Sequence, residues 1–242
     1  MGQFGLDHLW ANADLVQQAV AVLLVIMSAM SWYVIALKSW TLARLQKAAA
    51  AARADFWQTR SVAEGMETLG GDDNPFRQLA QAGLDCSHHH RHHEGTLGGA
   101  MGRSEWLLSG LRASIDESAS KLQSGMSILA SVSSTAPFVG LFGTVWGIYH
   151  ALVAIGLAGQ ASLDKVAGPV GEALIMTALG LAVAIPAALG YNALVRGNKT
   201  LVAKLNRFGY DLHAYFLTGT RVGETGGTPA PERLKAVPVA KV

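Results

Sequence analysis

Charged residues are scarce in this sequence. Lys, Arg, Asp and Glu make up 15% of its 242 residues, whereas 50% of the residues are apolar. Ordinary soluble domains carry about 25% charged residues, so the composition argues against one. The single cysteine, Cys86, excludes an intrachain disulfide and a CxxC framework for zinc or redox chemistry. A net charge of +2 gives no basic surface for nucleic acid, so no nucleic-acid partner is predicted.

Charges are absent altogether from long parts of the chain. None occurs in residues 15–37 or in residues 122–163, and Glu172 is the only one between Lys165 and Arg196. A bilayer core about 30 Å thick is spanned by about 20 helical residues. We therefore expect a first transmembrane helix at 15–37, a second within a long helix at 125–159, and a third at 166–195.

Basic residues follow the first and third spans, and none precedes the first. They are Lys38, Arg44 and Lys47 after the first span, and Arg196, Lys199, Lys204 and Arg207 after the third. Because cytoplasmic segments are rich in Lys and Arg, residues 1–14 and the turn at 160–165 are expected in the periplasm. The predicted fold is an all-α integral membrane protein, with three transmembrane helices extended by cytoplasmic helices. The cytoplasmic parts are a helical domain at 38–124, a helix at 196–217 and a disordered tail at 218–242, where Gly, Pro and Thr dominate.

The cytoplasmic domain contains a histidine cluster, His88–His93. It lies between two expected amphipathic helices, at 76–84 and 106–122, after a turn at 70–75. The cluster invites a metal site, but tandem histidines do not converge on one tetrahedral ion without a defined scaffold. The alternative is a solvated connection tip, and neither a metal nor a cofactor is predicted. The chain also lacks a recognisable nucleophile–base pair or HExxH motif, so no enzymatic activity is predicted.

Small residues recur at helical spacing in the second and third spans, and we call this set the small-residue seam. Its packing members are Pro137, Gly140, Gly143, Gly147, Ala173, Gly180, Ala184 and Pro186. In lipid, small residues let helix backbones approach closely. We expect the seam to pack these helices tightly and to hold copies of the chain together. Pro186 is expected to bend the third span by freeing a backbone carbonyl.

Two threonines, Thr144 and Thr177, belong to the same faces as the seam. With the turn centred near residue 161, both lie about 24–26 Å from it at 1.5 Å per residue. An antiparallel hairpin would therefore place the two hydroxyls at nearly the same depth. One interpretation makes them the lining of a proton path. In the other, each hydroxyl only bonds the carbonyl one turn back in its own helix.

Glu172 is the only acidic residue in the third span. An ionisable group within a membrane indicates an ion or proton path. The alternative is an interfacial glutamate stabilised by a helix N-terminus after Pro169. By helical angle it faces a flank or a neighbouring helix, away from the centre of the seam. His150, in the second span, is either a proton relay or an interfacial packing residue.

Two runs in these spans resemble a known family. Residues 136–148, APFVGLFGTVWGI, and residues 166–181, VAGPVGEALIMTALGL, are similar to consecutive helices of the proton-channel family that contains ExbB, TolQ and MotA. One departure is Gly171, where alanine is expected. The resemblance implies a homopentamer around the transmembrane helix of a smaller, ExbD-like partner that carries an intramembrane aspartate. The seam itself has no titrating acid, which fits a carboxyl supplied by such a partner.

Length and three-span topology fit two branches of the family. The N-terminal segment and the overall resemblance favour the ExbB type. This type implies an inner-membrane motor subunit that, with ExbD and a TonB-like energy transducer, uses the proton motive force to energise outer-membrane uptake of iron–siderophore complexes and vitamin B12. The alternatives are a TolQ-type subunit of the Tol-Pal envelope-integrity system and a nonconducting membrane scaffold.

Overall fold

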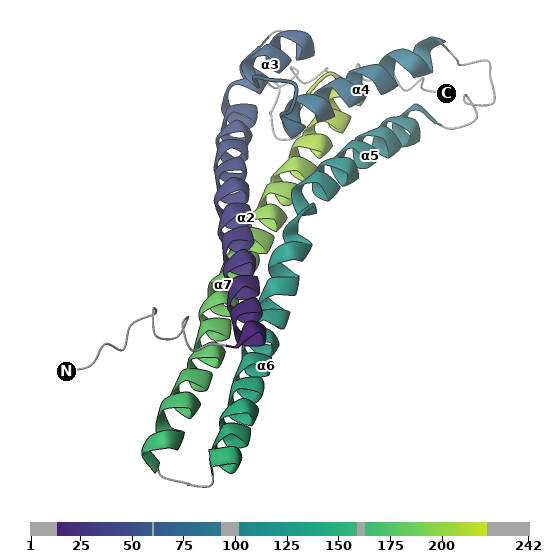
Figure 1. Cartoon of the computed structure of the whole chain (residues 1–242). Helices are drawn as coiled ribbons and strands as arrows, with labels where there is room; N and C mark the ends of the chain where they lie inside the picture. Colours follow the sequence, from purple (N-terminus) through teal and green to yellow (C-terminus); the bar gives the residue numbers. More distant parts are fainter. Residues whose placement is uncertain (1–13, 60, 93–101, 159–162, 222–242) are drawn as a thin grey trace, which may run out of the picture. The chain divides into compact units, whose positions relative to one another are not determined.

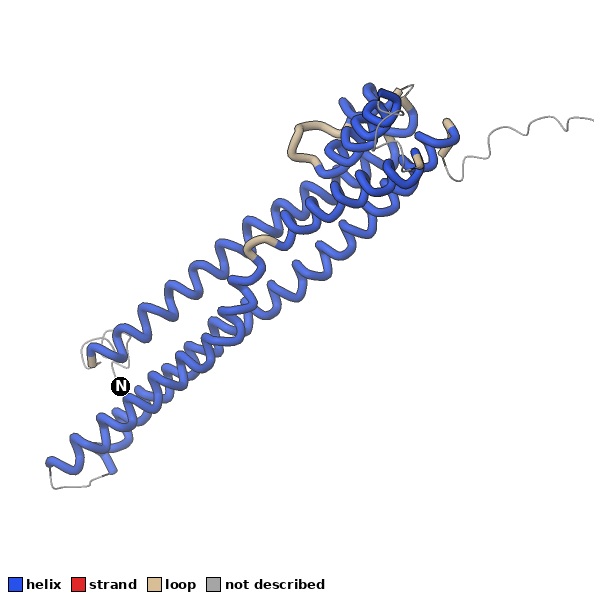
Figure 2. Tube along the Cα trace, turned by 90° about the vertical axis from the view of Figure 1, so that its right-hand side faces the viewer, coloured by secondary structure: helices blue, strands red, loops and turns tan. Residues whose placement is uncertain are grey.

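The computed structural model describes residues 14–59, 61–92, 102–158 and 163–221, and the regular structure in these ranges is helical (Figures 1 and 2). The helices are α2 (Leu15–Ala54), the 3-10 helix η1 (Phe56–Gln58), α3 (Val62–Thr68), α4 (Pro75–His92), α5 (Arg103–Gln123), α6 (Met126–Ala158) and α7 (Leu163–Thr218). The chain forms two compact units. The membrane unit comprises residues 1–47 and 119–201, and the second unit comprises residues 48–118 and 202–242.

Three helical segments in the described part of the chain are long and apolar enough to cross a membrane. They run over Leu15–Gln58, Arg103–Leu157 and Val170–Thr218, and each covers most or all of one of the spans expected from the sequence. Each segment continues well beyond about 20 residues, the length that a bilayer requires. The helix α7 runs unbroken through Pro186 to Thr218, so the expected third span and the helix after it form one element.

Apolar residues at steps of three and four bring α2 against both other helices of the membrane unit. A Cβ placed on Gly143 of α6 would lie 3.0 Å from Val20, and one placed on Gly190 of α7 would lie 2.6 Å from Ile35. Gly197 of α7 is likewise next to Leu42. The contacts advance in the same direction along α2 and α7, so these helices are parallel, and α6 runs antiparallel to both. The buried core that they share consists of Val20, Leu24, Met27, Val34, Met126, Leu129, Val132, Ala136, Met176, Ala184, Ala187 and Leu194.

A sharp break separates α5 from α6 at Gly125, which has a φ of 75°. Glycine adopts this left-handed conformation without a Cβ clash. Side chains from the other two helices hold the exposed end of α5. Lys38 Nζ lies 3.3 Å from the carbonyl oxygen of Leu122, and Asn198 Nδ2 donates to the same oxygen at 3.1 Å. A cation and an amide thus satisfy carbonyls that a helix end leaves unpaired.

Aromatic side chains form much of the interior of the second unit. The ring of Phe208 lies edge-on to Phe56 and to Phe76, at 5.0 and 5.6 Å between centroids. The turn before α4 is where the sequence places it. There, buried Asn74 donates to the Leu69 carbonyl and accepts from the Phe76 amide. This double use of one side chain both closes the turn and starts the helix.

The histidine cluster differs from the expected connection tip, because α4 continues to His92 and does not end at residue 84. No glycine or proline interrupts the sequence between Gly83 and Gly95, so nothing stops the helix earlier. His89 stacks on Trp106 of α5 with centroids 5.7 Å apart. The described residues contain no group of His, Cys, Asp and Glu that fits a metal ion, and the rest of the cluster lies outside the described side chains.

Candidate functional site

Thr144 and Thr177 meet at the contact between α6 and α7. Their hydroxyl oxygens are 2.5 Å apart, which confirms the equal depth expected from helix rise. Thr144 is buried and also lies 3.2 Å from the Gly140 carbonyl oxygen and 3.1 Å from that of Ala173. The bond to Gly140 is the one to the preceding turn that the second interpretation expects, and the lining of a proton path stays a prediction.

The protons of this pair can be placed by counting donors. A threonine hydroxyl has one proton and two lone pairs. When Thr144 donates to a carbonyl of Gly140 or Ala173, only Thr177 can supply the proton between the two hydroxyls. The oxygen of Thr177 then keeps lone pairs for an outside donor, and this side chain is only half-buried. Thr144 therefore orients Thr177, and Thr177 is the hydroxyl that another group can reach.

The small-residue seam closes the contact that surrounds this pair. A Cβ on Gly140 would lie 2.6 Å from the Met176 carbonyl oxygen and 3.0 Å from the Gly180 Cα. A Cβ on Gly147 would lie 3.0 Å from that of Ala173. The sequence correctly predicts close helix packing, but the packed helices belong to one chain. The expectation that these glycines hold copies together is therefore corrected to packing between α6 and α7 within each chain.

Glu172 lies on α7, half-buried, and makes no hydrogen bond or ion pair to any described residue. The helix begins at Leu163, nine residues and about 14 Å before Glu172. The stabilising effect of a helix N-terminus is confined to its first turn. Stabilisation of Glu172 by a helix start after Pro169 is therefore wrong, and the carboxyl lies well inside a helix among apolar residues.

Contacts with α2 give the relative depths of these groups. Gly147 packs against Ala173 and is next to Gln17, which places Glu172 near the level of Gln17, about 3 Å along α2 from Leu15. Gly143 and Met176 pack near Val20, about 8 Å along α2 from Leu15. Thr144 and Thr177 are the next residues in the sequence after Gly143 and Met176, so the hydroxyl pair lies at nearly the same depth as Val20. The acid thus lies toward the start of α2, and the hydroxyls lie about one turn deeper.

A polar cluster that the sequence did not predict lies at the same end of the membrane unit. Trp146 Nε1 donates to the Asp14 carboxylate at 3.1 Å, and His150 Nε2 lies 3.8 Å from the same oxygen. The rings of Trp146 and His150 are 4.9 Å apart. The bond from Trp146 and that from the Leu15 amide lower the pKa of Asp14 below its usual 3.8, and nearby His150 adds to this. Both interpretations of His150, a proton relay and a packing or interfacial residue, are compatible with these contacts and stay predictions.

Large apolar side chains are exposed along all three helices of the membrane unit. They include Val25, Trp32, Tyr33, Phe138, Val145, Leu152, Ile185 and Leu189. Soluble proteins rarely leave so much contiguous apolar surface uncovered. Lipid or protein in the membrane must therefore cover these faces. At Gly171, the one departure from the expected motif, an added Cβ would meet no atom within 4 Å, so alanine and glycine are sterically equivalent there.

Comparison with known proteins agrees with this arrangement. Residues 72–207 match the MotA/TolQ/ExbB proton channel family. The biopolymer transport protein ExbB of Xanthomonas campestris pv. campestris is 42% identical over 233 residues, which cover 92% of each chain. ExbB of Neisseria gonorrhoeae is 42% identical over 213 residues, 88% of this chain and 97% of that protein. The Tol-Pal system protein TolQ of Pseudomonas aeruginosa is 32% identical over 216 residues, 86% of this chain and 93% of that protein.

The family match covers both runs that resemble it, and the similarity to the ExbB proteins extends over nearly the whole chain. The matched region contains the hydroxyl pair, the seam and Glu172. Three helices that can cross a membrane fit a multi-pass membrane protein of this kind. The chain belongs to the MotA/TolQ/ExbB proton channel family.

Proposed function

We propose that this chain is the ExbB-type subunit of an inner-membrane proton-driven motor that energises TonB-dependent transport across the outer membrane. The observation that carries the proposal is the hydroxyl pair of buried Thr144 and half-buried Thr177 in a tightly packed seam, with Glu172 about one turn nearer the start of α7. Protons enter past Glu172 and reach the exposed lone pairs of Thr177. Thr144, on the buried side of the pair, fixes the orientation of Thr177 through the hydrogen bond between their hydroxyls.

A proton-carrying group is missing from the pair itself. Threonine hydroxyls do not titrate in the physiological range, and α6 has no acidic residue. The nearest carboxyl described on α7, Glu172, lies about one turn from Thr177, so a carboxyl that binds Thr177 directly is expected to come from another protein. We propose that it is the intramembrane aspartate of an ExbD-like partner with a single membrane span. Its protonated form donates to Thr177, and this bond is lost when the proton leaves.

Several copies of the chain are needed to enclose such a partner. One chain leaves apolar side chains exposed on α2, α6 and α7, more than a single partner helix would cover. We propose a homopentamer, in which some of these faces meet neighbouring copies and others meet lipid. Because the seam is used within the chain, the contacts between copies involve the exposed faces.

The orientation in the membrane follows the basic residues. Lys38 reaches the end of α5 at Leu122, and Asn198 reaches the same carbonyl, so the three apolar stretches end at one common level. Positive charge concentrates on the far side of that level, which marks the cytoplasm. We propose that residues 1–14 and 160–165 are periplasmic and that the C-terminus is cytoplasmic, although both periplasmic segments lie largely outside the described residues.

The TolQ type is the second candidate, because a TolQ protein is also similar over most of the chain. The higher identity to two ExbB proteins favours the ExbB type. The two are distinguished by complementation. A cell lacking its own ExbB should recover siderophore-dependent growth when it makes this chain with its partner. Restored detergent resistance in a cell lacking TolQ, without restored iron uptake, would identify the TolQ type.

The experiment that tests the proton path measures uptake of a labelled iron–siderophore complex at matched expression. Valine keeps the shape of threonine but removes its donor and acceptor. Loss of a hydrogen-bond partner for a buried polar group costs about 1–3 kcal/mol. We expect Thr177→Val to reduce uptake strongly, Thr144→Val to reduce it less, and the double change to reduce it most.

Threonine-to-serine changes at the same positions are the matched controls. Serine keeps the hydroxyl, so Thr144→Ser and Thr177→Ser should retain most uptake. Native mass spectrometry of each variant should show an unchanged complex, which separates a lost proton path from lost assembly. Full uptake in the double valine variant would make both threonines packing residues, and the proton path would then be sought elsewhere, first at Glu172.

A further inference from the structure

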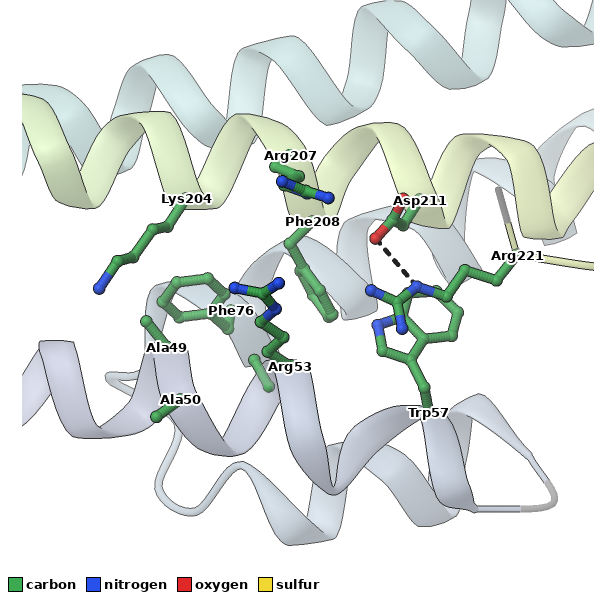
Figure 3. A pocket seen from close by; sticks show the side chains of 11 residues that line it. Ala49, Ala50, Arg53, Trp57, Phe76, Lys204, Arg207, Phe208, Asp211 and Arg221 are labelled. Atoms are coloured by element: carbon green, nitrogen blue, oxygen red, sulfur yellow. Dashed lines mark hydrogen bonds and ion pairs between the residues drawn. The ribbon is translucent and has the colours of Figure 1, made fainter. Parts of the chain in front are cut away.

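A pocket in the second unit combines basic side chains with an aromatic wall (Figure 3). Its volume is about 220 Å³. It is lined from α2, η1, α4, α7 and the residue Arg221, which follows α7. Its basic and phenylalanine side chains are Arg53, Phe76, Lys204, Arg207, Phe208 and Arg221. Phe76 and Phe208 are buried, whereas Arg53, Lys204 and Arg207 remain exposed.

Among the described residues that line the pocket, Asp211 is the only acid. Asp211 is buried and pairs with Arg221, whose Nε lies 3.1 Å from the carboxylate. The guanidinium of Arg221 also lies over the Trp57 ring, 5.2 Å from its centroid. One carboxylate and one aromatic ring thus fix Arg221. Within the described residues, no hydrogen bond or ion pair engages Arg53, Lys204 or Arg207.

Within the described lining, the positive charges of Arg53, Lys204, Arg207 and Arg221 therefore outnumber the one negative charge. Figure 3 shows Arg53 extending from α2 toward the space beside Phe208, with Arg221 approaching the same space from the other side. Guanidinium groups form paired hydrogen bonds to phosphate, and lysine adds a compact positive charge. Several cations near one opening favour a dianion over a monoanion such as a carboxylate. Phe76 and Phe208 are only 1% and 5% exposed and form the covered floor of the pocket, so the apolar surface that a small organic group can reach is that of Ala50 and Trp57.

From these features we infer that the pocket binds a small phosphate monoester, with the phosphate at Arg53 and Lys204 and its organic group against Ala50 and Trp57. Its volume is below the 300–1,000 Å³ typical of sites for larger ligands, so the ligand carries only a small organic group. This site is separate from the hydroxyl pair and from the proton path.

A lipid phosphate offers the same chemistry, but the length of α2 argues against it. Arg53 follows Leu37, the expected end of the first span, by sixteen helical residues, or about 24 Å. The headgroup layer extends only about 5–8 Å beyond the hydrocarbon core on each side. The phosphate of a bilayer lipid therefore does not reach the pocket, and the ligand is a soluble phosphate ester.

Isothermal titration calorimetry on the purified full-length chain tests this, with phenyl phosphate as the probe and inorganic phosphate and phenol for comparison. We expect phenyl phosphate to bind more tightly than either fragment. Arg53→Gln should weaken this binding about tenfold or more, because a charge-assisted hydrogen bond is lost. The double variant Arg53→Gln/Lys204→Gln should weaken it further. Arg112→Gln, a change of an exposed arginine on α5, should leave it unchanged.

Three results would overturn the inference. The first is no heat of binding with phenyl phosphate at about 10 mM, far above the concentrations at which specific ligands bind. The second is equal weakening by Arg112→Gln, which would mean general attraction to a basic protein. The third comes from chains reconstituted in nanodiscs: phenyl phosphate that competes only when phosphatidylglycerol is absent would assign the pocket to lipid. All of these readouts are independent of transport, so they stand whether or not the proposed motor function holds.

Discussion

The indole Nε1–H of Trp146 donates a 3.1 Å hydrogen bond to Asp14, a residue 132 positions earlier in the chain. This bond ties the start of α2 to the C-terminal half of α6. The carboxylate also accepts from the Leu15 amide at 2.8 Å, as a helix N-terminus favours. One side chain thus caps α2 and fixes that helix to its neighbour.

The first prediction concerns the pH dependence of this contact. The bond from Trp146, with those from Leu15 and nearby His150, lowers the pKa of Asp14 below 3.8 in the folded chain. A lowered pKa means that the contact stabilises the fold above pH 3.8 and that this contribution is lost as pH falls through the folded value. Trp146→Phe should raise the pKa of Asp14 toward 3.8, measured by carboxyl NMR titration. The melting-temperature difference between Trp146→Phe and the wild type should shrink in acid, and a constant difference would contradict the assignment.

The second prediction separates packing within the chain from packing between copies. Gly140→Ala introduces a Cβ 2.6 Å from a backbone oxygen, and overpacking of this kind costs about 1–3 kcal/mol. The melting temperature in detergent should fall. Gly171→Ala is the matched control on α7, because its Cβ meets open space and alanine favours helix. A Gly140→Ala protein that melts at the wild-type temperature but dissociates into single chains would contradict this. It would show that the seam holds copies of the chain together.

The sequence predicts the depth of the hydroxyl pair because two simple quantities determine it, the rise of a helix and the position of the turn. Thr144 and Thr177 meet as those quantities require. A periodic pattern of small residues also identifies which helix face packs closely. It does not identify the partner of that face, and here Gly140 meets Gly180 of the same chain.

Two other features depend on residues that no local pattern connects. Asp14 and Trp146 are far apart in the sequence, and only the packing of α2 on α6 brings them together. The basic pocket likewise draws Arg53, Phe76 and Arg207 from three separated helices. Periodicity describes one element at a time, so sites assembled from several elements require the fold.

The third prediction concerns the native cysteine. Cys86 packs against Gly110 of α5, and its burial, with the Asp85 carboxylate beside it, raises the pKa of the thiol above 9.0. The thiolate is the reactive form, so maleimide modification at pH 7 should be slow and should accelerate as pH rises past 9. The control moves the thiol to an exposed site on α5, in the variant Cys86→Ala/Ser109→Cys, which should react faster at pH 7 by mass spectrometry. Equal rates at both positions would contradict the burial of Cys86.

The fourth prediction concerns the break between α5 and α6. Gly125 has a φ of 75°, which costs about 1–2 kcal/mol for a residue with a Cβ. Gly125→Ala should lower the melting temperature. Gly125→Asn should lower it less, because asparagine tolerates the left-handed region. If alanine and asparagine destabilise equally, the space around residue 125, and not its backbone conformation, limits the substitution.

The last prediction concerns Glu172. A half-buried carboxyl with no partner among the described residues is unfavourable within a membrane, and such groups are retained where an ion or proton passes. Its place one turn outward from Thr177 fits a group that passes protons to the hydroxyl pair. Glu172→Gln keeps the shape but cannot titrate, so uptake of an iron–siderophore complex should fall about tenfold or more, as expected when a proton-transfer group is removed. Glu172→Asp keeps the carboxyl and should retain part of the activity. Wild-type uptake by the glutamine variant, in a complex of unchanged size, would show that protons bypass this residue and reach Thr177 by another route.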